Sequence, residues 1–455
     1  MRQSPTHHGD DARSSSTGGA SALLVTEAGH HQRDIYDLRL TTTPEAAAQF
    51  RDAQERLLKV QDGAEAPLRR AVAQDPDFAI AHATLALLGN EFDMCVDGGG
   101  HLHRAQRSAL RATERERSFV SAVSARIRGD HDHQARLLRH IADYPRDSLA
   151  LTIAVPTIAF SGSIEIPEQA WTVVERARTT FGSDWWYAGL LAFVRQEQGH
   201  YAEAAELASG ALATEPAAGH AAHALSHAFY EMNRHREGLR WLEGWIQDNR
   251  RTAFMPSHFS WHAALHELAL GDETAVRLRY VRELSPDSVQ GVRALVDSAS
   301  LLWRARLDDA WSGALPIDEV LSVVDEELLV RPPTTFVAMH AAVALAARGD
   351  AVGLRRLGRS AALDSPAHRE LVVPLTAAMA ALVDGHADRA AQILMRLMPE
   401  VERFGGSKAQ REIIELTLLH ALLESGHARA AQQMIQHALD RPTAISSWFP
   451  AQRSS

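Results

Sequence analysis

Six histidines at helical spacing fall within residues 220–266 and form the most unusual chemical feature of the sequence. In the segment GHAAHALSHAFYEM, intervals of three, four and four residues place three histidines and a glutamate on one helix face. The segment PSHFSWHAALHELAL spaces three further histidines four residues apart. The two stripes are His220, His223, His227 and Glu231 in the first segment, and His258, His262 and His266 in the second.

Imidazoles in this arrangement suit three kinds of chemistry. A metal ion needs about three or four imidazole or carboxylate ligands, and two histidines four residues apart on a helix supply two. Histidine also titrates near neutral pH, as general acid and base catalysis requires. Recognition of a polar ligand needs only donors and acceptors that are held in place. A structural role is the alternative, in which the imidazoles bond to one another, to carbonyl groups and to water. HELAL at 266–270 is not the HExxH zinc-protease motif, because position 270 is leucine.

The elements that position these residues are predicted to be helices. Proline and glycine fall mainly between alanine-rich and leucine-rich segments of helical period. No run of alternating β-branched residues predicts a strand. Turn signals recur 33 to 41 residues apart, at Gly129, Gly162, Gly199, Asn233, Gly271, Asp308, Gly349, Gly385 and Gly426. That spacing is the period of tetratricopeptide repeats, in which two antiparallel helices form a unit that stacks on its neighbours. The sequence therefore predicts an all-α fold, a tetratricopeptide-like helical-hairpin superhelix (α-solenoid) of about ten units.

The first helices of these units are predicted at 77–90, 115–128, 147–160, 184–198, 219–232, 256–270, 292–306, 333–347, 368–384 and 409–425. The small residues at Ala204, Ala208 and Ala211 support close helix packing, which a generic helical bundle would not require. The two histidine stripes lie on consecutive first helices. Since such helices lie side by side in a stacked array, we expect the stripes to converge in one pocket.

The sequence also predicts the limits of the domains, and its composition excludes several classes of function. Residues 1–34 are expected to form a disordered tail, 35–312 the N-terminal and central repeats with the histidine-rich pocket, 313–332 a linker or bend, and 333–445 the C-terminal repeats. A net charge of -10 argues against a nucleic-acid partner, and no stretch is long and apolar enough to span a membrane. With Cys95 as the single cysteine and no signal peptide, a cytoplasmic location fits best. Phosphate-loop, dinucleotide-binding and CxxC motifs are absent, and no cofactor is recognised, although a divalent metal remains open.

The chain resembles the tetratricopeptide repeat protein 38 family across residues 35–440. The similarity rests on the segment 189–245, on HFSWHAALHELALG at 258–271, which resembles that family's HxxWHxAL motif, and on VDSASLLWR at 296–304. The resemblance implies a site built from His223, His227, Glu231, His258, Trp261, His262, Asp297, Arg304 and His340. The chain departs from the family at His220, where tryptophan is usual, and at Val337 and Ala338, where the family has Asn-Asp.

Two hypotheses for function follow. In the first, the pocket binds or transforms a small molecule in a bacterial specialised-metabolism pathway. His223, His227, His258 and His262 then act as acid and base groups or metal ligands, and Asp297 orients an imidazole. His220, Glu231, Trp261, His266, Arg304 and His340 would line this pocket, with Trp185 and Trp186 as an apolar wall. The bacterial origin is inferred from 45 arginines against two lysines. In the alternative, the protein is a scaffold that binds a partner peptide in the superhelical groove.

Overall fold

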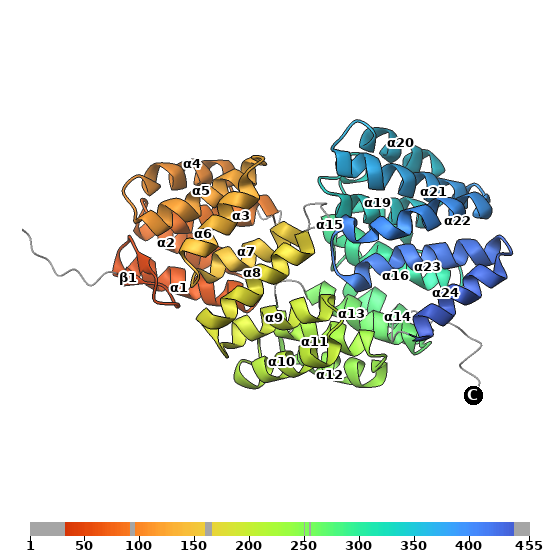
Figure 1. Ribbon diagram of the computed structural model, residues 1–455, viewed down its shortest axis with the longest axis horizontal. Helices are drawn as coiled ribbons and strands as arrows, with labels where there is room; N and C mark the ends of the chain where they lie inside the picture. Colours follow the sequence, from red (N-terminus) through yellow and green to blue (C-terminus); the bar gives the residue numbers. More distant parts are fainter. Residues whose placement is uncertain (1–31, 92–95, 160–165, 250, 254–255, 441–455) are drawn as a thin grey trace, which may run out of the picture. The chain divides into compact units, whose positions relative to one another are not determined.

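Antiparallel helical hairpins account for almost all of the computed structural model, which describes residues 32–91, 96–159, 166–249, 251–253 and 256–440 (Figure 1). The first hairpins contain α1 (Pro44–Leu58), α2 (Glu65–Gln74), α3 (Ala79–Glu91), α4 (Gly98–Ala109), α5 (Glu114–Arg128), α6 (His133–Asp143), α7 (Ser148–Ala159) and α8 (Ile166–Phe181). The central hairpins contain α9 (Trp185–Glu197), α10 (Tyr201–Thr214), α11 (Gly219–Glu231), α12 (His235–Asn249), α13 (Pro256–Ala269) and α14 (Glu273–Arg279).

The remaining helices complete the array toward the C-terminal end. They are α15 (Gly291–Arg293), α16 (Ser300–Leu307), α17 (Ile317–Ser322), α18 (Glu326–Val330), α19 (Thr335–Arg348), α20 (Ala351–Ala361), α21 (Val373–Val383), α22 (Ala387–Leu397), α23 (Lys408–Glu424) and α24 (Ala428–Asp440). Three π-helical turns interrupt the α-helices, at η1 (Tyr280–Leu284), η2 (Ala294–Ala299) and η3 (His368–Val372), and η4 (Met398–Phe404) is a 3-10 helix.

The predicted all-α array of helical hairpins is confirmed. Each predicted first helix begins and ends within two residues of an observed helical segment. Successive first helices pack on one another, α9 on α11, α11 on α13, α13 on α16, α16 on α19 and α19 on α21. Two of the turn signals are observed directly, since Gly129 and Gly349 end their helices with φ of 68° and 78°, in the left-handed region that glycine adopts without strain. The predicted turn at Gly162 lies outside the described residues.

The predicted tail and linker both contain folded residues. Strand β1 (Gln32–Arg33) pairs antiparallel with β2 (Arg39–Leu40), so part of the segment assigned to the tail, residues 32–34, belongs to the ordered structure. Residues 1–31 and Cys95 lie outside the described part of the chain. The expected linker at 313–332 contains α17 and α18, and Ile317 and Val320 are buried in the core.

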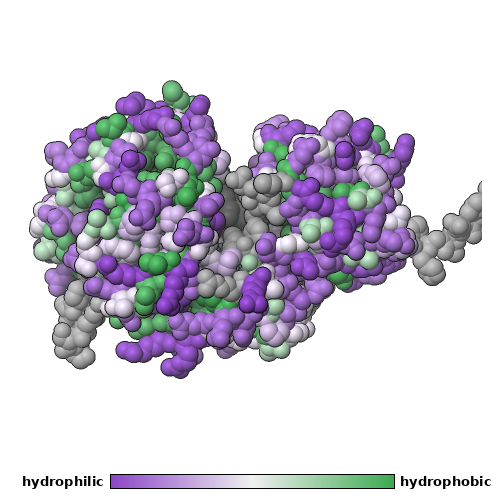
Figure 2. Space-filling model, turned by 180° about the vertical axis from the view of Figure 1, so that it is seen from behind, coloured by the Kyte–Doolittle hydropathy of each residue, from purple (hydrophilic) through white to green (hydrophobic). Residues whose placement is uncertain are grey.

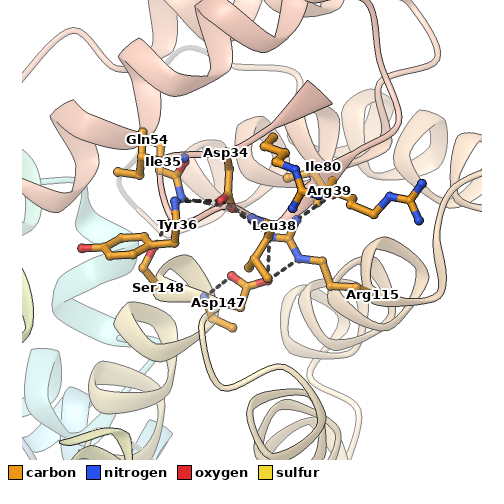
Figure 3. Close-up of polar contacts among 12 residues, drawn as sticks. Asp34, Ile35, Tyr36, Leu38, Arg39, Gln54, Ile80, Arg115, Asp147 and Ser148 are labelled. Atoms are coloured by element: carbon orange, nitrogen blue, oxygen red, sulfur yellow. Dashed lines mark hydrogen bonds and ion pairs between the residues drawn. The ribbon is translucent and has the colours of Figure 1, made fainter. Parts of the chain in front are cut away.

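A buried ion network fixes the β1–β2 turn onto the first hairpins (Figure 3). The Arg115 guanidinium lies 2.8 Å from the Asp147 carboxylate and 3.4 Å from the Asp34 carboxylate. Asp34 also accepts hydrogen bonds from the backbone N–H groups of Tyr36 and Leu38. Burial raises the pKa of Asp147, but Arg115 and His140 outweigh this and hold it well below its usual range. The N-terminal segment is therefore held by charge as well as by packing.

The surface of the array is largely hydrophilic. Figure 2 shows one face on which polar residues predominate and apolar residues are interspersed among them. Large exposed apolar side chains are spread along the chain, with Val281 in η1, Val352 in α20, and Leu110 and Leu363 in the turns that follow α4 and α20. Within the described residues, no helix is long and apolar enough to cross a membrane.

Candidate functional site

Four histidines from two neighbouring first helices meet in the interior, as the sequence predicts. His223 and His227 come from α11, and His258 and His262 from α13. The His223 Nε2 atom lies 3.0 Å from His258 Nε2 and 3.1 Å from His227 Nε2. The His262 ring centroid is 4.4 Å from that of His227, 4.7 Å from that of His258 and 5.0 Å from that of His223. We refer to His223, His227, His258 and His262 as the histidine cluster.

Close helix packing brings an aromatic ring against this cluster from α9. Gly189 lies so near α11 that an added Cβ would be 3.0 Å from the Ala221 backbone nitrogen. One turn further along α9, the Phe193 ring stacks on His223, with centroids 5.5 Å apart and planes 17° apart. The cluster therefore has an apolar wall, and Phe193 supplies it.

Asp297 joins the cluster from η2, and it is fully buried. Its Oδ1 atom accepts a hydrogen bond of 3.0 Å from His258 Nδ1. Arg293 and the Ser257 hydroxyl also donate to this carboxylate. Since π-helical turns shift side chains relative to a regular α-helix, η2 determines where Asp297 points. The predicted role of Asp297 in orienting an imidazole agrees with this geometry.

Trp261 packs flat against His258. The two rings are stacked, with centroids 5.4 Å apart and planes 8° apart, and the Trp261 Nε1–H donates a 3.0 Å hydrogen bond to the Ser300 hydroxyl. The Arg304 guanidinium lies over the Trp261 ring, 5.9 Å from its centroid. His258 is thus held at its edge by Asp297 and on its face by Trp261.

Burial keeps the cluster uncharged at neutral pH. It lowers the pKa of His227 to about 3, and it lowers the pKa of His223, His258 and His262 as well. Burial raises the pKa of Asp297, but Arg293 and His258 outweigh this and hold it at about 2. The site at neutral pH therefore combines neutral imidazoles with one ionised carboxylate.

His266, which was predicted to line the pocket, instead pairs with His235. Their Nδ1 atoms are 3.1 Å apart, and the Tyr230 ring lies beside both imidazoles. Burial lowers the pKa of His266 to about 3 and that of His235 to about 4. His266 therefore forms a separate pair with His235, next to the histidine cluster.

Gly238 on α12 leaves the space that His266 occupies. A Cβ there would lie 2.7 Å from His266 Cε1 and 2.8 Å from the Phe229 Cβ. We expect Gly238→Ala to lower the free energy of unfolding by about 1–3 kcal/mol, because the ring must shift within a packed core. Urea denaturation measures this. Gly244→Ala on the same helix, where an added Cβ meets nothing, is the matched control and is expected to stabilise by about 0.4–1 kcal/mol. Equal effects of both substitutions would contradict the argument.

Glu231 and Arg304 contact α23 rather than the histidine cluster. The Glu231 carboxylate lies 2.5 Å from Lys408 Nζ, which also donates to the Tyr201 hydroxyl. Burial raises the pKa of Glu231 to about 7 in spite of Lys408. Arg304 forms a buried ion pair of 3.0 Å with Glu412. These two predicted site residues therefore connect the central helices to the C-terminal region.

Four other predicted residues lie outside the cluster. His340 on α19 is buried and donates from Nδ1 to the Phe336 carbonyl. His220 is half-buried, and burial lowers its pKa to about 4. Trp186, which was predicted to form an apolar wall, is fully buried against Tyr36 and Phe181. Trp185 also packs among the apolar residues around it, so Phe193 takes the place of the predicted wall.

Sequence reasoning missed several residues that shape the site. Arg293 could have been found, because it stands four residues before Asp297 on the same helical segment. His235 lies only two residues beyond a predicted turn at Asn233. Lys408 and Glu412 carry no local signal, because they reach Glu231 and Arg304 from more than 100 residues away.

A solvent-open hollow lies far along the chain from these residues. It has a volume of about 680 Å³ and is lined by Pro76, Asp77, Arg104, Arg107, Ser108, Leu110 and Arg111. None of the predicted site residues lines it.

No protein-family model matches the chain. Solved structures to which it is similar include the crystal structure of the P58(IPK) TPR domain, with 15% identity, a TM-score of 0.22 and coverage of 84% of this chain and 89% of that chain. Another is the structure of Naa15/Naa10 bound to HypK-THB, with 12% identity, a TM-score of 0.25 and coverage of 90% of this chain and 64% of that chain. At such scores, the assignment of the helical-hairpin fold rests on the packing of this chain's own helices.

Proposed function

We propose that the histidine cluster binds a small molecule, as ligand or substrate, in a protein of the tetratricopeptide repeat protein 38 type. The single observation that carries this proposal is the convergence of four imidazoles from α11 and α13, three of them buried and that of His223 half-buried, beside the ionised Asp297. Scattered histidines would not share ring contacts across two helices. The arginine-rich composition fits a bacterial specialised-metabolism pathway, and the single cysteine fits a cytoplasmic location.

The polar atoms of the cluster are incompletely paired. Within the described residues, His227 Nδ1 and His262 Nε2 are buried and have no hydrogen-bond partner. An unpaired buried donor or acceptor costs about 1–3 kcal/mol, whereas leucine or phenylalanine would fill the same space without this cost. A bound molecule with its own donors and acceptors would pair these nitrogens. The imidazoles are thus better suited to recognising a polar ligand than to filling a core.

The surrounding residues would fix the orientation of the ligand. Asp297 accepts a hydrogen bond from the His258 Nδ1–H group, which leaves His258 Nε2 as an acceptor that faces the cluster. Trp261 and Phe193 hold the faces of His258 and His223. Apolar walls with a few converging polar groups are typical of small-molecule sites.

The test is native mass spectrometry of the full chain, followed by binding assays with any small molecule found. We expect wild-type protein to carry an additional mass that His262→Ala lacks while its far-UV circular dichroism is unchanged. His103→Ala, at an exposed position on α4, is the control and should retain the mass. Capture of a partner protein that binds His262→Ala as tightly as wild type, with no small molecule on either protein, would instead support the scaffold hypothesis.

A further inference from the structure

Three imidazoles of the cluster lie at the spacing that a metal ion requires. One nitrogen each of His223, His258 and His262 lies within 4.8 Å of the other two. Tetrahedral zinc holds nitrogen ligands at about 2.0–2.1 Å, so that the ligands lie about 3.3 Å apart. The 3.0 Å separation of His223 Nε2 and His258 Nε2 is within a few tenths of an ångström of this value. One nitrogen of each ring thus lies close enough to the other two to share one ion.

The positions of the protons make this convergence costly without a cation. Because His258 Nδ1–H donates to the Asp297 carboxylate, His258 Nε2 presents a lone pair to His223 Nε2. If His223 Nε2 is also unprotonated, two lone pairs face each other at 3.0 Å. If His223 Nε2 carries a proton, His227 Nε2 cannot donate to it. The proton of His227 must then stay on His227 Nδ1, which is buried and unpaired within the described structure.

Each neutral arrangement therefore leaves either two lone pairs facing each other, at His223 and His258, or an unpaired proton on His227 Nδ1. A divalent cation between the lone pairs of His223 and His258 removes the repulsion. His262 supplies the third imidazole of the group, and its buried Nε2 has no partner among the described residues. The ring of His262 is 99% covered, so water does not readily substitute for such a partner.

A carboxylate behind a histidine ligand is a further feature of metal sites. Such a group fixes the tautomer and orientation of the ring and raises its basicity. Asp297 occupies this position behind His258, and Arg293 and Ser257 hold Asp297 in turn. The stacked Trp261 restricts rotation of the same ring.

We propose that His223, His258 and His262 bind one divalent transition-metal ion, with Asp297 as the positioning residue behind His258. This inference rests on the proposed function, because the small molecule would complete the coordination of the ion. Three imidazole nitrogens suit zinc, copper, nickel or iron, whereas magnesium and calcium prefer oxygen ligands. Three protein ligands leave a coordination position for the bound molecule, and His227, in ring contact with His262, lies beside it.

The test uses full-length protein without a histidine tag, freed of metal with a chelator and then titrated with zinc chloride by calorimetry. We expect one zinc ion per chain for wild type and at least a 100-fold loss of affinity for His262→Ala. Asp297→Asn should keep the stoichiometry and lose roughly 10–100-fold in affinity. His103→Ala should bind as wild type does. Cobalt(II) in place of zinc should give the intense visible absorption of a four-coordinate ion in wild type and, at higher cobalt concentration, in Asp297→Asn.

Each outcome has a clear meaning, provided that circular dichroism shows the variants to be folded. Absence of zinc binding by wild type, or equal losses for His262→Ala and His103→Ala, would overturn the metal site. If wild type binds no zinc but a small molecule is still lost on His262→Ala, the proposed function stands without the metal. If zinc binds with the expected pattern but no small molecule is found, the metal site stands and the proposed function fails.

Discussion

Lowering the pH from 7 to 5 is expected to reduce the free energy of unfolding by roughly 6 kcal/mol through three buried histidines outside the proposed metal ligands. The three residues are His235, His266 and His340. Their pKa values in the folded protein are about 4, about 3 and about 4, and burial is the main cause in each case.

The surroundings of these rings explain why burial dominates. His235 and His266 face each other and Tyr230, and no carboxylate contributes to either pKa within the described structure. Around His340, the Phe336 carbonyl and Asp297 favour the charged ring, whereas Arg304 and Arg293 oppose it. Burial is the largest of these effects, so the pKa of His340 stays low and the ring is neutral at pH 7.

The direction of the pH effect follows from where the proton binds. Between the unfolded pKa of about 6.5 and the folded values, the unfolded chain takes up protons and the folded chain does not. Each such histidine costs about 1.4 kcal/mol per pH unit in this window, or about 2 kcal/mol at pH 5. Stability is therefore full above about pH 6.5 and falls as the solution is acidified.

Urea denaturation at pH 7 and at pH 5, with EDTA present so that metal release does not contribute, measures this loss. His340→Gln cannot take up the proton and should reduce the loss by about 2 kcal/mol, which is the share of this one residue. His386→Gln, at an exposed position, should leave it unchanged. An unfolding free energy that is the same at both pH values would show that these rings are not held neutral by burial.

Most of the fold could be predicted from the sequence because the repeats are local. Hydrophobic period, turn glycines and small packing residues repeat in every unit, and each unit contacts mainly its neighbours. The convergence of His223 with His258 followed from this regularity, since both stand on consecutive first helices. Phe193 and Trp186 show what the repeat pattern could not predict, namely which aromatic residue reaches the site. Both are aromatic residues of α9, and only the close approach at Gly189 directs Phe193 to the site.

The sequence did not predict two features, because they depart from the repeat. The π-helical turn η2 changes the direction of Asp297 without any proline or glycine within residues 294–299 to mark it. The contacts of α23 with α11 and α16 join residues 105 to 182 positions apart, as in Arg304 with Ala409 and Tyr230 with Glu412. Nearest-neighbour stacking cannot predict such contacts, because they depend on the path of the whole array.

Glu412→Gln is expected to lower the free energy of unfolding by about 3–5 kcal/mol, because it removes the only charge that the structure places in contact with the Arg304 guanidinium within the described residues. Arg304 is fully buried, its Nη1 atom lies 3.0 Å from Glu412 Oε2, and its Nη2 atom donates to the Ala409 carbonyl. Burial raises the pKa of Glu412, and Arg304 opposes that rise. An unpaired guanidinium in this position has no access to water.

A double-mutant cycle separates the pair from its surroundings. Arg304→Met and Glu412→Leu should each cost several kcal/mol, roughly 3–5, whereas the double variant should recover much of the loss, since no buried charge is left alone. Tyr230→Phe, which removes the 2.9 Å hydrogen bond to Glu412, should cost roughly 1.5–3 kcal/mol. Urea denaturation of all variants gives the coupling energy. Additive losses would mean that Arg304 and Glu412 stabilise α16 and α23 independently, and the contact between these helices would then rest on apolar packing and on the Trp303 to Thr417 hydrogen bond.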